Sequence, residues 1–180
     1  MIIRNKTIKQ AVKQTLACLA ILTWGAAPAR ADVPWTSDLQ QDAAAARAAN
    51  GVVLVVFVAS HCPYCETALN DFLIPMSGNA NYLAVVMRRV ESGGTHPLMD
   101  FQGHKLTGRQ LAAAYGVRLT PTVMVFDGEG HPLTKPVIGV STPDYYGTFL
   151  DQAIDQGVQQ VRARIGGRPH IAPDKPPGSK

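Results

Sequence analysis

Two cysteines that are three positions apart, Cys62 and Cys65, close the apolar stretch VVFVASHCPYC. This spacing suits a redox pair, part of a metal site or a small structural disulfide. A zinc site usually needs four ligands, and the sequence offers no second cysteine pair and no histidines paired at ligand spacing. A disulfide across two residues closes too small a loop to stabilise a fold much. The spacing therefore favours redox chemistry over a metal site or a structural disulfide.

The N-terminal segment bears on which compartment holds these thiols. Four cations lie within the first 13 residues, an apolar run covers 11–27, and Ala-Arg-Ala stands at 29–31. This order is typical of a secretory signal peptide, so we expect residues 1–31 to be removed after Ala31. An uncleaved anchor is the less favoured reading, since spanning a bilayer needs roughly 20 apolar residues. The third cysteine, Cys18, would leave with the leader, and export to the periplasm would permit a disulfide.

The charge of the chain depends on this leader. The formal net charge is +4, but five of the 17 Lys and Arg residues precede residue 32, which leaves 12 cations against 13 acidic residues, or about −1. The charge of residues 32–180 therefore does not predict a basic surface that binds nucleic acid. Residues 32–165 are enough for one domain, and 166–180, rich in Gly, Pro and charge, predict a disordered tail.

The elements expected between these ends alternate in type. We predict four helices: from Ser37 or Asp38 to about 50, from Cys62 to a kink or stop at Pro75 or Gly78, from Thr107 to Gly116, and from 141–144 to 165. The last helix is expected to have an apolar face made of Phe149, Leu150, Ile154, Val158, Val161 and Ile165. We predict strands at 52–59, 82–90, 120–127 and 131–139, with 91–105 a loop that holds a short extended piece at 99–101. This order predicts an α/β fold with a central mixed sheet of about four strands and helices on both faces.

The second helix begins at the cysteines, which gives them different roles. Unpaired amides at a helix start favour a thiolate, so Cys62 would be both the nucleophile and a good leaving group. Cys65 would face the core and resolve the mixed disulfide. Pro63 suits the first helical turn, and Tyr64 would form a wall of the substrate groove. His61, when charged, would stabilise the thiolate, although an ordinary loop role suits it equally.

Residues 35–165 resemble the thioredoxin superfamily. The resemblance rests on CPYC opening a helix after a buried strand, on Thr120-Pro121-Thr122 at the start of a later strand, and on Gly139 before the last helix. It implies a thioredoxin-like fold in which Pro121 is cis and packs against the cysteines. It also implies that the backbone of Thr120 binds an extended substrate.

Within this superfamily the chain is similar to exported SoxW-type thioredoxin-related proteins. The likeness lies in HCPYCETALNDFL, in residues 100–133, and in the insert around 91–105. It implies reduction of periplasmic protein disulfides with electrons from a membrane thiol donor. The chain departs from general thioredoxins at Val56, where they keep a buried aspartate. Its Pro-Tyr dipeptide looks like that of glutaredoxins and of a periplasmic disulfide isomerase.

The sequence thus predicts an exported, monomeric thiol-disulfide oxidoreductase that needs no cofactor and no metal. Its partners would be protein thiols and disulfides, and reduction is the favoured direction. Oxidase or isomerase activity is the first alternative. A Cu(I)-binding module that uses the same cysteines, with His61, is the second, since soft thiolates suit Cu(I). A binding protein that holds peptides beside Pro121 is the third.

Overall fold

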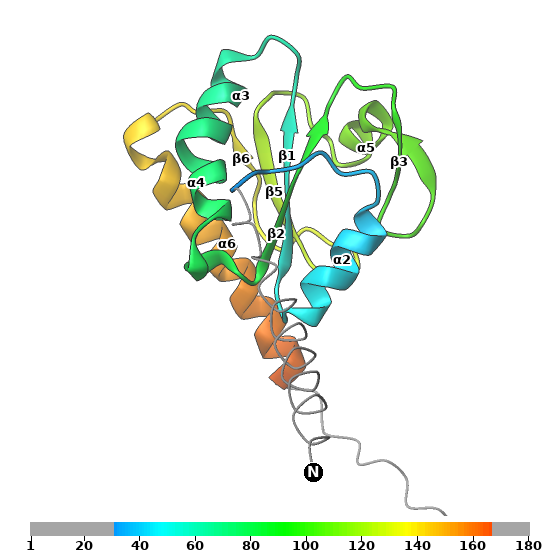
Figure 1. The fold of residues 1–180 in the computed structure, drawn as a ribbon, viewed down its shortest axis with the longest axis vertical. Coiled ribbons are helices and arrows are strands. Elements are labelled where there is room, and N and C mark those ends of the chain that lie inside the picture. Colours follow the sequence, from blue (N-terminus) through cyan, green and yellow to red (C-terminus); the bar gives the residue numbers. More distant parts are fainter. Residues whose placement is uncertain (1–30, 167–180) are drawn as a thin grey trace, which may run out of the picture. The chain divides into compact units, whose positions relative to one another are not determined.

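The computed structural model describes residues 31–166, which fold around one four-stranded sheet. Its strand order is β2-β1-β5-β6, and the strands span Val85–Glu91, Val52–Val58, Thr122–Phe126 and Val137–Ile138 respectively. Strand β1 pairs in parallel with β2 and antiparallel with β5, and β6 pairs antiparallel with β5 (Figure 1). The predicted mixed α/β sheet of about four strands is confirmed.

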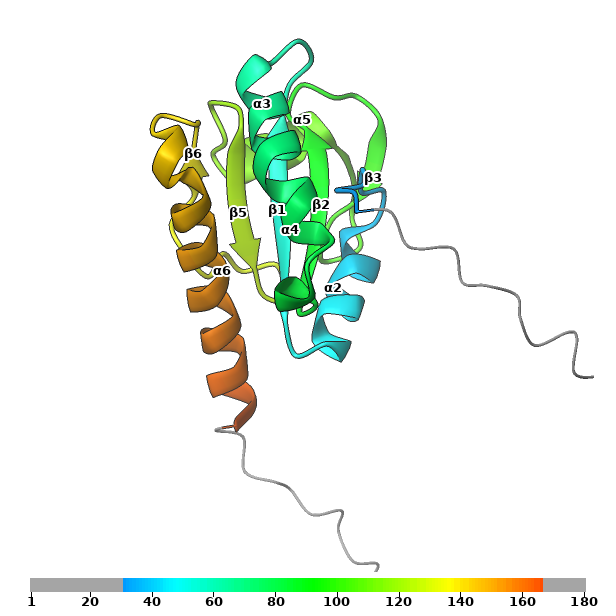
Figure 2. The ribbon, with the colours of Figure 1, turned by 60° about the vertical axis from the view of Figure 1, so that its left-hand side comes forward.

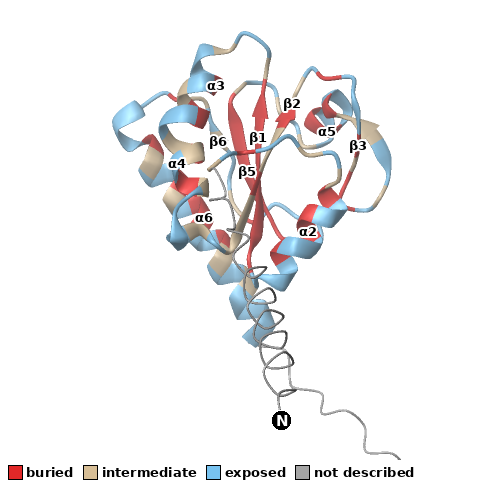
Figure 3. Ribbon diagram, in the orientation of Figure 1, coloured by how far each residue is buried: buried red, intermediate tan, exposed pale blue. Residues whose placement is uncertain are grey.

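Strand β1 is the centre of the core. All seven of its residues are buried, as Figure 3 shows for β1 and β5. Alternate side chains enter two hydrophobic clusters, with Leu54 and Val56 on one face and Val53 and Val55 on the other. A strand buried on both faces needs an unbroken apolar sequence, which VVLVVFV supplies.

Helices cover both faces of the sheet. One face carries a continuous helical segment made of α3 (Pro63–Thr67), the π-helical η1 (Ala68–Leu73) and α4 (Ile74–Ser77), together with α6 (Pro143–Gly166). The other face carries α2 (Leu39–Ala48) and α5 (Gly108–Ala114). Figure 2 shows α3 and α4 running in front of β1.

The helix boundaries follow from capping residues. The Asp38 side chain accepts a hydrogen bond from the Gln41 N–H and begins α2. Thr107 and Gln110 form a capping box that begins α5. That helix ends before Gly116, whose φ of 68° suits a residue without a Cβ atom. These starts agree with the sequence prediction.

The helix after the cysteines is not uniform. It changes to π geometry at Ala68–Leu73, where the N–H of Ile74 donates to the carbonyl of Leu69. Pro75 follows directly, and proline removes a donor and crowds the preceding turn, so a wider turn accommodates it. The predicted stop near Gly78 is confirmed, because Gly78 caps the end of α4.

Two predicted segments differ from the structure. The second strand begins at Val85 rather than Tyr82, which lies in the 3-10 turn η2 (Ala80–Tyr82). The segment predicted as a loop contains an antiparallel hairpin of β3 (Pro97–Met99) and β4 (Lys105–Thr107). Its turn forms because the Asp100 carboxylate accepts the N–H groups of two residues within the turn.

The third and fourth predicted strands are shorter than expected. Residues 120 and 121 lie outside β5, and β6 has only two residues. Pro132 and Pro136 lack the N–H that a ladder needs, so pairing between Phe126 and Pro132 is an isolated bridge.

The apolar face predicted for α6 is partly wrong. Phe149 and Ile165 are 45% and 46% exposed. Leu150 and Ile154 are buried as predicted, and Val158 and Val161 pack partly buried against the same cluster. The buried face also includes Tyr146, Ala153 and Gly157. The close approach explains Gly157, since a Cβ there would lie 2.7 Å from a methyl of Val125.

The ends of the chain are the remaining predictions of organisation. Helix α6 reaches Gly166, one residue past the predicted domain end. The predicted signal peptide (1–31), apart from Ala31, and the predicted tail (166–180), apart from Gly166, lie outside the described residues. Within residues 31–166, no helix is long and apolar enough to cross a membrane.

Candidate active site

The two predicted cysteines meet at the start of α3. Cys62 is the N-cap, Pro63 occupies the first turn, and a disulfide joins Cys62 to Cys65 with an S–S distance of 2.11 Å. The N–H of Cys65 donates to the Cys62 sulfur over 3.2 Å. Cys65 is 2% exposed, whereas Cys62 is partly accessible. A sulfur that is both reachable and hydrogen-bonded can act first, and the buried sulfur second.

The turn before Cys62 brings the chain out of the sheet. His61 has a φ of 57°, a left-handed conformation in which histidine is one of the more tolerated residues. His61 itself is exposed, as are Pro63 and Tyr64, the latter at 64%. The structure therefore places all three at the accessible rim of the cysteine pair.

The second half of the site comes from 58 residues further along the chain. The Thr120 carbonyl oxygen lies 3.8 Å from the Cys62 sulfur, and the Thr120 hydroxyl oxygen lies 3.7 Å from it. The Thr120–Pro121 peptide bond is cis, and Pro121 is buried. The structure thus brings Thr120 to Cys62, with the buried Pro121 next to it in the chain.

An apolar hollow beside Thr120 was not anticipated from the sequence. It has a volume of about 270 Å³, and Leu119, Met124 and Ile138 are among its lining residues. Leu119 is 66% exposed and Ile138 54%. Leu119, an apolar residue directly before Thr120, was the sequence signal that could have indicated this hollow. Leu119 and Thr122, on either side of the Thr120–Pro121 peptide, both line the hollow.

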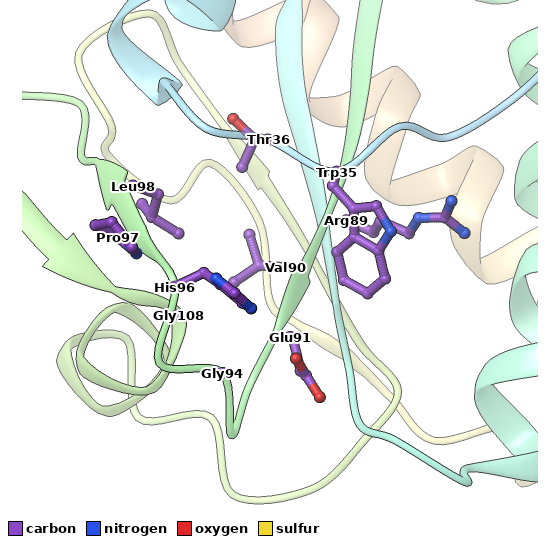
Figure 4. A pocket seen from close by; sticks show the side chains of 10 residues that line it. All are labelled: Trp35, Thr36, Arg89, Val90, Glu91, Gly94, His96, Pro97, Leu98 and Gly108. Atoms are coloured by element: carbon purple, nitrogen blue, oxygen red, sulfur yellow. The ribbon is translucent and has the colours of Figure 1, made fainter.

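Charged residues of β2 also reach the cysteine side of the sheet. The Arg89 guanidinium stacks on the Trp35 ring at 4.7 Å, and the Ser60 hydroxyl donates to Glu91 over 2.5 Å. Figure 4 shows Arg89 beside Trp35, with Glu91 further along the same strand. Sequence reasoning assigned no role to Glu91. Val56, in the middle of β1, is fully buried.

Shifted carboxyl groups lie in two turns of the same form, Asp100–His104 and Asp127–His131. Burial opposes ionisation of each aspartate, but backbone N–H donors in the turn outweigh it and hold the pKa of Asp100 and Asp127 below the ordinary value. Arg164 adds a further donor to Asp127 at 2.8 Å.

Side chains of types that can bind metals come together in one of these turns. Within residues 31–166, the side chains close enough together to hold a metal ion are those of Asp127, Glu129 and His131. Arg164 already pairs with Asp127 there. The predicted Cu(I) set of Cys62, Cys65 and His61 is not among the groups so arranged in the described residues.

Comparison with known proteins identifies the family. The sequence profile of the thioredoxin-like domain matches residues 39–154, so the chain belongs to the thioredoxin-like family. With its adjacent cysteine pair, it is a thiol-disulfide oxidoreductase. No curated protein matches the chain.

Among solved structures, the chain is similar to three thioredoxins. Thioredoxin of Malassezia sympodialis is 21% identical, with a TM-score of 0.47, over 76% of this chain and 98% of that one. Spinach chloroplast thioredoxin f is 16% identical, with a TM-score of 0.47, over 74% of this chain and 97% of that one. Oxidised mitochondrial thioredoxin 3 of Saccharomyces cerevisiae is 15% identical, with a TM-score of 0.47, over 68% of this chain and 93% of that one.

Proposed function

We propose that the protein is an exported oxidoreductase that reduces disulfides in other proteins. The supporting observation is the position of the Cys62 sulfur. It lies at a helix start, accepts the Cys65 N–H, and is within 3.7 Å of the Thr120 hydroxyl. Donors directed at a sulfur stabilise its thiolate, which is the form that attacks disulfides.

Reduction would proceed in two exchanges. The Cys62 thiolate attacks one sulfur of the substrate disulfide, a mixed disulfide forms, and the other substrate sulfur leaves as a thiolate. Cys65 then attacks the Cys62 sulfur, and the second substrate sulfur leaves. The substrate gains two electrons, and the protein gains the Cys62–Cys65 disulfide.

The substrate would lie as an extended segment across Thr120. The backbone of Thr120 would supply hydrogen bonds, and Leu119 and Tyr64 would contact flanking apolar side chains. Both of these side chains are more than 60% exposed, so no rearrangement is required for them to meet a partner. Substrates are therefore proteins with a disulfide in an accessible, flexible segment.

The proposed compartment and electron donor rest on the sequence. The predicted signal peptide supports export to the periplasm, with the protein acting as a monomer. The likeness to SoxW-type proteins supports a membrane thiol donor that returns the disulfide to the dithiol form. His61, Pro63, Tyr64, Thr120 and Pro121 form the proposed substrate-binding residues.

The direction of exchange is tested by the reduction potential of the Cys62–Cys65 pair against glutathione, with insulin reduction as the activity. A reductant is expected to have a potential near that of thioredoxin, about −270 mV. A potential near −120 mV, typical of a strong oxidant, would instead assign an oxidase. Cys62→Ser is expected to abolish turnover, and undiminished activity in that variant would exclude the mechanism.

A further inference from the structure

Strand β2 directs a carboxylate toward the buried cysteine. Alternate residues of β2 belong to different faces, since Val85 and Met87 pack in the cluster that contains Cys65, whereas Val86 and Val90 pack in the other. Side chains of a strand alternate between faces. Glu91 therefore lies on the face of Cys65, at the end of β2, where it pairs in register with Val58 of β1.

A cavity joins Glu91 to Cys65. It has a volume of about 220 Å³, and its lining includes Cys65, Glu91, Glu66, His61 and Arg89. Liquid water takes about 30 Å³ per molecule, so a polar cavity of this size holds several waters. Glu91 also lines a second cavity, of about 280 Å³, with His96 and Trp35. Glu91 thus lines both the cavity that reaches Cys65 and a second cavity next to it.

The resolving step requires a base at this point. Cys65 is 2% exposed, and it must lose its thiol proton before it can attack the mixed disulfide at Cys62. Val56, on the same face of β1, is apolar and cannot accept a proton.

We propose that Glu91 accepts the proton of Cys65 through water in the shared cavity. This inference rests on the proposed function. The proton passes from the Cys65 thiol to the Glu91 carboxylate as the Cys65 sulfur bonds to the Cys62 sulfur. The bond from Cys62 to the substrate breaks, and the substrate leaves as a thiolate that is protonated from Glu91 or solvent.

Glu91 is better placed for this role than the other carboxylate on the cavity. Glu66 is exposed, and its carboxylate accepts a hydrogen bond from Asn70. Glu91 is half-buried, and its carboxylate accepts a hydrogen bond from the Ser60 hydroxyl. The charged or titratable groups facing it are Arg89 on its own strand, His61 and Glu66 at the helix start, and His96 across the second cavity.

The experiment is a single-turnover reaction of the reduced protein with a symmetrical peptide disulfide, quenched in acid, alkylated and analysed by mass spectrometry. Glu91→Gln is expected to form the mixed disulfide at Cys62 within twofold of the wild-type rate. Its resolution is expected to slow at least tenfold at pH 7, since a positioned base contributes about 10²–10⁴-fold. The deficit is expected to shrink above pH 9, where hydroxide replaces the base.

Two further variants separate this role from a structural one. Glu91→Asp keeps a carboxylate and is expected to resolve faster than Glu91→Gln. Glu66→Gln is expected to resolve within twofold of wild type. Resolution by Glu91→Gln within twofold of wild type between pH 6 and 8 overturns the inference, as does a loss confined to Glu66→Gln. Failure of the reduced wild type to be oxidised by the peptide disulfide at all would instead refute the proposed function.

Discussion

Replacing Thr120 with valine tests whether its hydroxyl stabilises the Cys62 thiolate. Valine keeps the branched shape and the backbone of Thr120 but removes the donor that lies 3.7 Å from the sulfur. A hydrogen bond contributes about 0.5–1.5 kcal/mol net, and the length of this one points to about 0.5–1 kcal/mol. The reduced form loses that stabilisation, whereas the disulfide does not need it.

The sign and size of the effect follow from this difference. Destabilising the reduced form makes the disulfide harder to reduce, so the potential becomes more negative by about 10–20 mV, because 30 mV corresponds to about 1.4 kcal/mol. The acid dissociation constant of the Cys62 thiol falls about two- to fivefold, because about 1.36 kcal/mol corresponds to one pKa unit. The attack rate falls less, since a less stabilised thiolate is more nucleophilic, with a Brønsted coefficient of about 0.4–0.5.

The assay is equilibration with glutathione buffers, with the dithiol fraction counted by alkylation, alongside thiolate absorbance at 240 nm as a function of pH. Thr120→Ser, which keeps the hydroxyl, is the matched control and is expected to stay close to wild type. A potential and a thiolate fraction in Thr120→Val equal to those of wild type would refute the role of the hydroxyl.

Three further predictions concern the frame that positions the site. Asp127→Asn is expected to lower the free energy of unfolding by about 1–3 kcal/mol at pH 7. Because the pKa of Asp127 is lower in the folded than in the unfolded protein, this stabilisation is present at neutral pH and is lost as the pH falls below about 4. The unfolding free energies of the two proteins, measured in urea, should therefore converge in acid, and a difference that does not change with pH would contradict the assignment. Thr107→Ala removes the cap of α5 and is expected to cost about 1 kcal/mol by urea unfolding, with no change expected for Thr95→Ala at an exposed loop position. Gly116→Ala and Gly130→Ala both place a Cβ at positive φ, which costs about 1–2 kcal/mol. Only at Gly130 would that Cβ also lie 2.6 Å from the Phe101 side chain, so Gly130→Ala should melt at a clearly lower temperature than Gly116→Ala. Equal melting temperatures would refute the clash.

The elements with strong local signals could be predicted from the sequence. The unbroken apolar run of β1, the caps at Asp38 and Thr107, and the stop at Gly78 each act within a few residues. The hairpin of β3 and β4 was missed because it depends on one side chain, Asp100, which satisfies backbone donors that a loop would leave to water. Phe149 was assigned to the core because helical periodicity gives a face but not the width of the neighbour that covers it.

The site divides in the same way. The cysteine spacing and the helix start are local, so the nucleophile and the resolving thiol could be proposed from sequence. Thr120 and Pro121 were found only through the resemblance, since their approach to Cys62 spans 58 residues. Glu91 could not be found, because its face depends on the register of β2 against β1 and its link to Cys65 on a cavity that only the folded chain encloses.

The central claim, that Cys62 exchanges disulfides with proteins and Cys65 resolves them, is tested most directly by trapping the mixed disulfide. Cys65→Ala, incubated in its reduced form with insulin and analysed by non-reducing mass spectrometry, is expected to form a stable adduct through Cys62 that dithiothreitol releases. Cys62→Ala is expected to form far less, because Cys65 is buried. No adduct in Cys65→Ala, or as much adduct in Cys62→Ala, would contradict the claim.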